Sequence, residues 1–185
     1  SAASDVYKRQ AEGIDTDYAQ SAAVFSIQDE EITYAQNIYQ RMYPASTTKI
    51  LTAYLALKYG NLDDVLTVSS DAVNTLMSGS SICGLKPGDQ LTLDQALYGL
   101  MLCSGNDAAN VIAEYISGST DKFAELMNKE AQALGATSSH FVNPHGLPDD
   151  NHYTTAYDLY LIFNAAIKDA VSYTHLRAHE TVLDL

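Results

Sequence analysis

The chain has 185 residues, enough for one domain with a sizeable buried core. Its 10 basic and 23 acidic side chains give a formal net charge of −13, which argues against nucleic acid as a partner and against electrostatic docking on anionic lipid. Cys83 and Cys103 are too few for a disulfide scaffold and lack metal-cluster spacing. Each is expected to be a small buried residue, with a bridge between the two as the alternative.

Neither end of the chain continues the pattern of its neighbour. Residues 1–10 (SAASDVYKRQ) and 171–185 resemble translated sequencing adapters, so we interpret both as tails unrelated to the domain. The domain is then assigned to residues 11–170, as a segment of a longer protein. No apolar run approaches the ~18 residues of a membrane span, and no cleavable signal sequence is visible.

The first predicted element is a β-hairpin within residues 21–36. Its two halves, AAVFSIQ and EITYAQ, are rich in β-branched and aromatic residues that alternate with polar ones. A short polar break at Asp29 and Glu30 separates them. This pattern is typical of two antiparallel strands joined by a tight turn.

A serine and a lysine three residues apart open the next element. Pro44 favours a first helical turn, and the apolar run from Ile50 to Leu57 continues at helical spacing. Residues three apart share one helix face, which places the Lys49 ammonium within reach of the Ser46 hydroxyl. A serine hydroxyl becomes a good nucleophile when a neighbouring base takes its proton. The pair is therefore a candidate nucleophile and base.

The middle of the chain predicts short elements and one well-marked helix. Residues 63–68 read as extended, residues 71–76 as a short helix, and the pair Pro87-Gly88 as a turn. Thr92 and Gln95 form a capping box at the start of a helix. The inward stripe of that helix is expected to be Leu93, Ala96, Leu97, Leu100 and Met101.

Polarity returns at residues 104–107, Ser-Gly-Asn-Asp. Gly105 should end one helix, and Asn106 or Asp107 should cap the next, over residues 108–116. Taken alone, Ser104 and Asn106 could simply cap helix ends. After the Ser46 and Lys49 pair, they are also candidates for a second part of the same site.

Two helices and a loop complete the predicted domain. The helix over residues 120–134 stops at Gly135, and its inward residues are Phe123, Leu126, Met127, Ala131 and Leu134. Residues 140–153 hold three histidines, yet their spacing matches no helical metal motif, so they predict an ordered loop. Thr154 or Thr155 should cap a last helix that runs through Ala166.

Three of these stretches together resemble a known family. Pro44 to Ile50 (PASTTKI), then Ser104-Gly105-Asn106, then Asn143 to Leu147 (NPHGL) are similar to serine-type D-alanyl-D-alanine carboxypeptidases, the low-molecular-weight penicillin-binding proteins. The resemblance implies an α/β (α+β) fold, a DD-peptidase or β-lactamase-like transpeptidase domain with an N-terminal β-hairpin and a helical region. The family's Lys-Thr-Gly motif is absent from this sequence. We therefore expect that the C-terminal strands of the sheet are missing and that this chain alone is inactive.

The resemblance also implies roles for single residues. Ser46 would be the acylated nucleophile, Lys49 its base, Ser104 a proton relay to the leaving group, and Asn106 a hydrogen-bonding group for the substrate's backbone amide. No metal or organic cofactor is implied. The implied substrate is a peptidoglycan stem peptide ending in D-Ala-D-Ala, with β-lactams as inhibitors. The implied location is the cell envelope outside the cytoplasm, with membrane association of the longer protein.

Three alternatives remain open at this point. A class A β-lactamase shares the serine and lysine motif, but residues 141–157 contain no Glu-x-x-Leu-Asn element for the deacylating water. A penicillin-recognising sensor would keep the site without turnover. An inactive truncation would expose apolar surface and unpaired strand edges.

Overall fold

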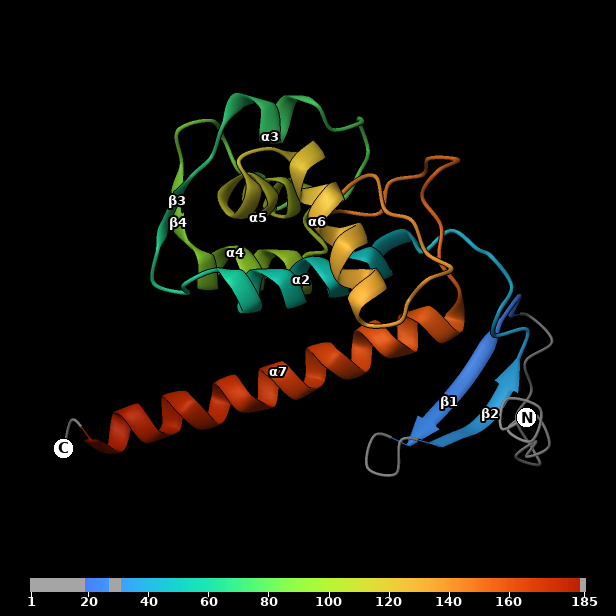
Figure 1. Cartoon of the computed structure of the whole chain (residues 1–185). Helices are drawn as coiled ribbons and strands as arrows, with labels where there is room; N and C mark the ends of the chain where they lie inside the picture. Colours follow the sequence, from blue (N-terminus) through green and yellow to red (C-terminus); the bar gives the residue numbers. More distant parts are fainter. Residues whose placement is uncertain (1–18, 27–30, 184–185) are drawn as a thin grey trace.

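The computed structural model describes residues 19–26 and 31–183, with side chains described up to residue 170. Short strands precede and interrupt a group of packed helices (Figure 1). In chain order the elements are β1 (Ala22–Ser26), β2 (Glu31–Gln36), a 3-10 turn (Ala45–Thr47), α2 (Thr48–Tyr59), β3 (Val65–Thr67), α3 (Ser70–Asn74), β4 (Gln90–Thr92), α4 (Leu93–Leu102), α5 (Asn106–Ser117), α6 (Thr120–Ala133) and α7 (Ala156–Leu183).

The predicted N-terminal hairpin is confirmed. β1 and β2 pair antiparallel, with a register shift between Val24 and Phe25. The hairpin lies to one side of the helical body, next to the first part of α7 (Figure 1). The ring of Phe25 stacks on that of Tyr160, with the centroids 3.9 Å apart. An aromatic contact therefore fastens this otherwise separate sheet to the start of α7.

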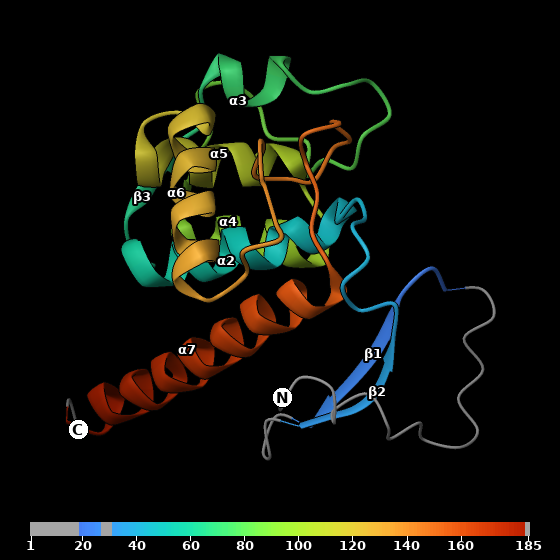
Figure 2. The same ribbon diagram turned by 45° about the vertical axis from the view of Figure 1, so that its right-hand side comes forward.

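Helix α2 is the centre of the helical body, between α4 and α5 on one side and α6 and α7 on the other (Figure 2). It contributes to two hydrophobic clusters. Its Ala56 packs with residues of α4 and α5, while its Leu51, Tyr54 and Leu55 pack with Phe123 and other residues of α6 and α7. Because α2 is buried on two faces, its apolar residues are distributed around most of the helix circumference. It also fixes the position of the segment that precedes it, which carries Ser46.

A second small sheet pairs β3 with β4, and residues 90–92 were not expected to form a strand. The pairing has a local cause, because Val68 donates its N–H to Asp89 O at 2.9 Å and the Pro87-Gly88 turn brings the two segments together. The extended segment and short helix predicted on either side of residue 69 are confirmed as β3 and α3.

The capping box of Thr92 and Gln95 is present at the start of α4, as predicted. Leu93, Ala96 and Leu100 are buried, but Met101 is 54% exposed, so its assignment to the inward stripe was wrong. The expectation of a buried Cys103 was also wrong, because that residue is exposed at the end of the helix. Both errors fall at the helix end, where the chain turns away from the core.

Helix α5 begins at Asn106, and its N-cap is Gly105 without a side-chain hydrogen bond. The prediction that Asn106 or Asp107 would cap it was therefore wrong. Asp107 lies inside the first turn, and its carboxylate is directed at the backbone of a different segment, residues 83–85. The buried acid serves this tertiary contact and also accepts the N–H of Ala108, in the first turn of α5, at 2.9 Å.

Helix α6 buries Phe123, Met127 and Ala131 as predicted. The Thr155 hydroxyl accepts the N–H of Asp158 at 3.1 Å and so caps α7, which continues as one helix to Leu183. Whether residues 171–185 are a tail unrelated to the domain stays a prediction, as it does for residues 1–10, which lie outside the described residues. In the part of the chain that the structure covers, no helix combines the length and apolarity needed to span a bilayer.

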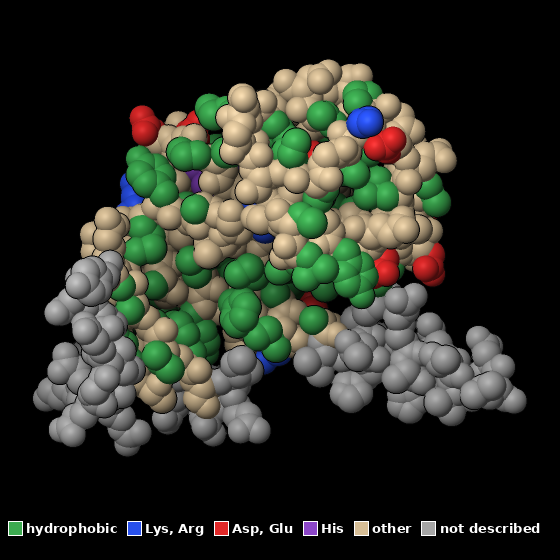
Figure 3. Space-filling model, turned by 180° about the vertical axis from the view of Figure 1, so that it is seen from behind, with side chains coloured by type: hydrophobic (Ala, Val, Ile, Leu, Met, Phe, Trp, Pro, Cys, Tyr) green, Lys and Arg blue, Asp and Glu red, His purple; other side chains and the backbone are tan. Residues whose placement is uncertain are grey.

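The face seen from behind carries hydrophobic side chains over its lower half, with acidic side chains toward its edges (Figure 3). Several large apolar side chains are among the exposed residues of the chain, including Tyr98, Met101 and Leu102 of α4.

Candidate active site

Ser46 lies in a 3-10 turn that joins α2, where a continuous helix from Pro44 was expected. The difference arises at Ala45, whose φ of +50° is left-handed, an uncommon conformation for a residue with a side chain. The turn leaves Ser46 exposed at the mouth of the site. Strained backbone next to a reactive residue is a recurrent feature of functional sites.

Lys49 follows one turn later and is 97% shielded from solvent, with 3% of its surface exposed. Its Nζ lies 3.4 Å from Ser46 Oγ and donates to the carbonyl of His145 at 2.9 Å. Burial lowers the pKa of the Lys49 ammonium, because a poorly hydrated charge is disfavoured. A lysine with a lowered pKa can release its proton and then act as the base for Ser46.

Ser104 reaches the same oxygen from a distant part of the sequence. It follows the end of α4 with a φ of +50°, and its Oγ lies 3.2 Å from Ser46 Oγ. The structure thus brings the predicted residues Ser46, Lys49 and Ser104 together. A hydroxyl can accept one proton and donate another, so this geometry allows proton transfer at Ser46 Oγ.

Asn106, the fourth predicted residue, lies two positions further on, at the start of α5. It is 4% exposed, and its N–H donates to Ser81 O at 2.8 Å. In the described residues, no hydrogen bond joins its side chain to Ser46, Lys49 or Ser104. Its role toward a substrate stays a prediction.

The backbone N–H of Ser46 is available for a ligand. Within residues 19–26 and 31–183, that N–H makes no hydrogen bond, whereas the N–H of Thr47 donates to Pro44 O at 3.2 Å. The N-terminal end of α2 adds a partial positive charge beside it. A developing oxyanion on an atom attacked by Ser46 Oγ would meet this N–H group.

Residues 140–153 form the predicted ordered loop, and it packs against α2. His152 Nδ1 accepts the N–H of Val142 at 3.0 Å, so the proton of the neutral ring is on Nε2, which lies 2.8 Å from Thr48 Oγ1. Burial lowers the pKa of His152 to about 4, and the charge of His140 adds to this while Asp149 opposes it. The neutral His152 ring therefore connects the loop to the helix through one hydrogen bond to each.

Gly146 allows the closest contact between this loop and the serine turn. Its φ is +90°, and a Cβ atom at this position would lie 1.8 Å from Ala45 O. Next to it, Thr52 Oγ1 donates to Pro144 O at 2.6 Å, which holds the loop on the same face of α2 as Thr48. Only glycine fits this approach, and the approach brings the His145 carbonyl to Lys49.

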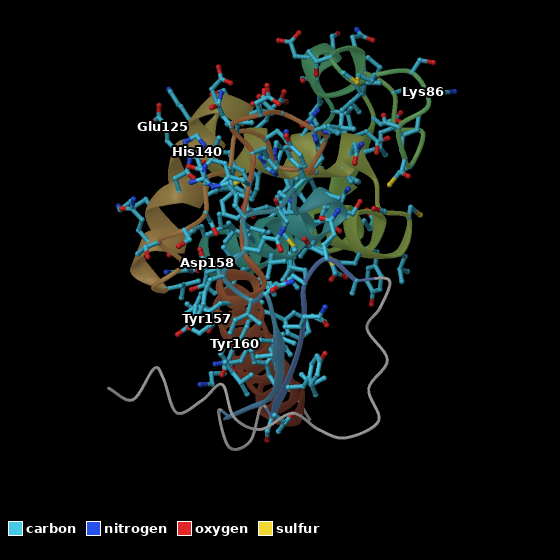
Figure 4. The ribbon with its side chains drawn as sticks, turned by 90° about the vertical axis from the view of Figure 1, so that its right-hand side faces the viewer. Lys86, Glu125, His140, Tyr157, Asp158 and Tyr160 are labelled. Atoms are coloured by element: carbon cyan, nitrogen blue, oxygen red, sulfur yellow. The ribbon has the colours of Figure 1, made fainter. Side chains whose placement is uncertain are left out.

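The loop is also anchored from its outer side. Asp158, in the first turn of α7, accepts the N–H of Ser138 at 2.8 Å and the hydroxyl of Ser139 at 2.6 Å. Figure 4 shows Tyr157, Asp158 and Tyr160 on α7, with Asp158 the nearest of the three to His140, which lies beside α6. Asn128 of α6 makes a further pair of hydrogen bonds with the backbone of Phe141. The loop is thus fixed to three helices, α2, α6 and α7.

Sequence reasoning missed Asp107. Its buried carboxylate accepts N–H groups of Cys83, Gly84 and Leu85 at 2.8, 3.0 and 3.0 Å. These bonds hold residues 83–85 against the start of α5 and so support the turn that carries Ser104. The available signal was an acid next to a Ser-x-Asn element, which was assigned to a helix cap. Among the described residues, no group of three or more histidine, cysteine or acidic side chains has a metal-binding arrangement.

Ser46 is an exposed serine whose Oγ lies within hydrogen-bonding distance of a buried lysine and of a second serine. This arrangement is that of a serine acyl-transfer site. Comparison with known proteins agrees: the D-alanyl-D-alanine carboxypeptidase family (peptidase S11) matches residues 8–183. The chain belongs to this family.

Individual relatives support the same assignment. The chain is 37% identical to D-alanyl-D-alanine carboxypeptidase DacF of Bacillus subtilis over 154 residues, 81% of this chain and 39% of the relative. It is 38% identical to DacA of Escherichia coli over 159 residues, 82% of this chain and 40% of the relative. The crystal structure of DacD from Francisella tularensis superposes with a TM-score of 0.78 at 33% identity, covering 85% of this chain and 38% of that one. The chain therefore spans about two fifths of these relatives.

Proposed function

We propose that the protein is a serine hydrolase that removes the terminal D-alanine from peptidoglycan stem peptides through an acyl-enzyme on Ser46. One observation carries the proposal: Ser46 Oγ lies 3.4 Å from Lys49 Nζ and 3.2 Å from Ser104 Oγ. The names of the relatives, D-alanyl-D-alanine carboxypeptidases, support the substrate class. Since the chain spans part of those relatives, the proposal concerns the whole protein.

Acylation begins with proton transfer. Neutral Lys49 takes the proton of the Ser46 hydroxyl, and Oγ attacks the carbonyl carbon of the penultimate D-alanine. The Ser46 N–H donates to the oxyanion of the tetrahedral intermediate. Ser104 donates a proton to the nitrogen of the leaving D-alanine as the C–N bond breaks, and the proton that Lys49 took from Ser46 replaces it, so that Ser104 and Lys49 both end neutral. The products of this step are free D-alanine and a peptidyl ester on Ser46.

Deacylation reverses the proton movements. Lys49 takes a proton from a water molecule as the water oxygen attacks the ester carbon, and that proton returns to Ser46 Oγ as the C–O bond to Ser46 breaks. The shortened peptide leaves with a new carboxylate. A β-lactam would acylate Ser46 in the same way, but its amine stays tethered to the acyl group after ring opening, which disfavours the approach of water.

The environment of Lys49 suits this role. Its ammonium has a backbone carbonyl and a serine hydroxyl as partners, at 2.9 and 3.4 Å. Neither partner carries the negative charge that would hold the lysine protonated, while burial lowers its pKa. The lowered pKa means that Lys49 gives up its proton more readily than an exposed lysine does, as the role of base requires.

The substrate class also suggests a location. Peptidoglycan lies outside the cytoplasm, so the proposal includes export to the cell envelope and membrane association of the full-length protein. Neither the β-lactamase nor the sensor alternative is favoured by any contact of the site. A sensor would acylate once, whereas the proposed enzyme releases D-alanine continuously.

The test is mass spectrometry after incubation with benzylpenicillin, on this chain and on the chain extended by the coding sequence that follows it in its gene. We expect a β-lactam adduct on the peptide that contains Ser46 in the extended protein, together with steady release of D-alanine from a D-Ala-D-Ala peptide. Ser46→Ala should abolish the adduct, and Lys49→Ala should slow its formation by about a thousandfold or more.

The matched control is Ser70→Ala, which removes an exposed serine of α3 and should label normally. An undiminished adduct in Ser46→Ala would identify another nucleophile. Folded protein without any adduct in either form would overturn the proposal.

A further inference from the structure

The two cysteines lie beside the Ser104 turn, on different segments. Cys83 belongs to the segment that Asp107 holds, and Cys103 closes the end of α4 immediately before Ser104. Both are free thiols, with Cys83 half-buried and Cys103 exposed. The mechanism proposed above uses neither of them.

The sulfur of Cys83 packs directly on the backbone around Cys103. A Cβ atom built on Gly99 would lie 2.7 Å from Cys83 Sγ, and one built on Gly105 would lie 2.3 Å from it. Gly99 O accepts the N–H of both Cys103 and Gly105, each at 3.2 Å. Two glycines thus make room for the sulfur over the turn that Cys103 occupies.

Hydrogen bonds hold both segments in this relation. Cys83 N–H donates to the Asp107 carboxylate at 2.8 Å, and Asn106 N–H donates to Ser81 O at 2.8 Å. Burial raises the pKa of the Cys83 thiol to about 12, with further contributions from Asp107 and from contact with the Cys103 side chain. The two side chains are therefore neighbours in a fixed arrangement, and the exposed Cys103 is the more reactive of the two.

We propose that Cys83 and Cys103 are an oxidisable pair, a site of reversible disulfide modification that ties residues 81–85 to the Ser104 turn. The oxidant is an external disulfide such as oxidised glutathione. The Cys103 thiolate attacks it, forming a mixed disulfide and releasing one glutathione thiolate. The Cys83 sulfur then attacks Cys103 Sγ and releases the second glutathione. Two protein thiols are oxidised, one external disulfide is reduced, and both protons end on glutathione.

The consequence is a covalent constraint on the site, added to the hydrogen bonds of Asp107. The bridge joins residues 83 and 103, so it closes the chain around β4 and α4 and fixes the residue that precedes Ser104. Burial of Cys83 makes the second exchange slow, and the position of equilibrium is therefore the quantity to measure. This inference does not depend on the proposed function, because it concerns the thiols alone.

The test equilibrates the folded chain with a series of reduced and oxidised glutathione ratios, followed by acid quenching, alkylation and peptide mapping. We expect loss of two hydrogen atoms and a linked peptide pair containing Cys83 and Cys103, without bound glutathione. The fold holds the sulfurs close together and so favours the bridge. Half of the folded chain should therefore still be bridged at a glutathione ratio at least about tenfold more reducing than the ratio that bridges half of the same chain in denaturant.

The matched control combines Cys83→Ser with Ser78→Cys, which moves the thiol to an exposed position of the same loop. That variant should behave like the unfolded chain. The proposal is overturned if Cys103 retains glutathione while Cys83 stays reduced, if the folded and unfolded chains bridge at the same ratio, or if the control bridges as readily as the natural pair.

Discussion

The two walls of the site are held in different ways. The wall formed by residues 140–153 rests on several separate bonds, among them those of His152 with Thr48 and of the Pro144 carbonyl with Thr52, and the Asp158 carboxylate holds residues 138 and 139 directly before it. The wall formed by residues 81–85 and the Ser104 turn rests on one buried carboxylate, that of Asp107, which accepts three N–H groups of residues 83–85.

The difference teaches where each wall is vulnerable. Several bonds hold the first wall, so no single one dominates, but the wall needs an uncharged His152 and the close backbone approach at Gly146. The second wall concentrates its hydrogen bonds on one side chain, and a carboxylate is a stronger acceptor than a neutral oxygen. We therefore expect the walls to respond differently to substitution and to pH.

The largest effect is expected for Gly146→Ala. A methyl group would lie 1.8 Å from Ala45 O and the φ of +90° is unfavourable for alanine, so either the loop or the serine turn must move. We expect a loss of about 4 kcal/mol in the free energy of unfolding, measured in urea. Gly118→Ala is the control, since its φ is +83° but a Cβ there meets nothing within 4 Å, and it should cost only about 1 kcal/mol. Equal losses would show that the contact at Ala45 is unimportant.

Asp107→Ala should come next, at about 3 kcal/mol, because it leaves four N–H groups without their acceptor, those of residues 83–85 and that of Ala108. Asp107→Asn keeps one carbonyl oxygen and should lose less. Hydrogen exchange of the amides of residues 83–85 is the local readout, and it should accelerate in Asp107→Ala while amides of residues 141–146 are unchanged. Unaltered protection at residues 83–85 would contradict the assigned role of the carboxylate.

Acidification should act on the first wall. The pKa of His152 is lowered from 6.5 to about 4 in the folded chain, so the unfolded chain takes up a proton first as the pH falls. Stability from this group is complete above pH 6.5 and is lost progressively toward pH 4, about 2 kcal/mol of it by about pH 5. Burial and the nearby charge of Lys49 lower the pKa of His145 to about 4, with the same sign of effect.

Urea denaturation at several pH values measures that slope, and NMR titration of the His152 ring measures its pKa directly. His152→Gln removes one titrating group and should flatten the slope between pH 6.5 and about pH 5. A His152 ring that titrates near 6.5 would contradict the assignment of a buried, neutral ring between the loop and α2.

The smallest effect is expected for Thr48→Val, which removes one neutral hydrogen bond at the same size of side chain. The bond between Thr48 Oγ1 and His152 Nε2 is 2.8 Å long and buried, so its loss should cost about 1 to 2 kcal/mol in urea denaturation. Thr137→Val, at an exposed position after α6, is the control and should be nearly neutral. A loss near 3 kcal/mol would mean that the first wall also depends on a single group.

Much of the helical fold follows from local pattern. The capping box at Thr92, the inward residues of α6 and the hairpin over residues 21–36 are read from neighbours in the sequence, and each is confirmed. The same holds for the Ser46 and Lys49 pair, because three-residue spacing along a turn fixes their proximity. Local rules succeed where the deciding contacts are local.

The remainder depends on contacts between distant segments. Nothing near Asp107 in the sequence indicates that its carboxylate serves residues 83–85, and a helix cap was the natural local reading. Likewise, Gly146 packs against the left-handed backbone of Ala45. These two residues are far apart in the sequence, so local propensities do not predict their contact. The exposure of Met101 and Cys103 depends on where the chain leaves α4.

A pair of backbone hydrogen bonds between Met42 and Thr154, both 2.9 Å long, has a consequence for folding. It ties Met42, a few residues before the serine turn, to the residue that follows the 140–153 loop, and the Thr48–His152 bond inside it spans 104 residues. Such closures carry a large entropic cost and follow local structure in time. On a ribosome, the reactive serine therefore emerges long before its first wall exists, and the site assembles only after residue 154 has been synthesised.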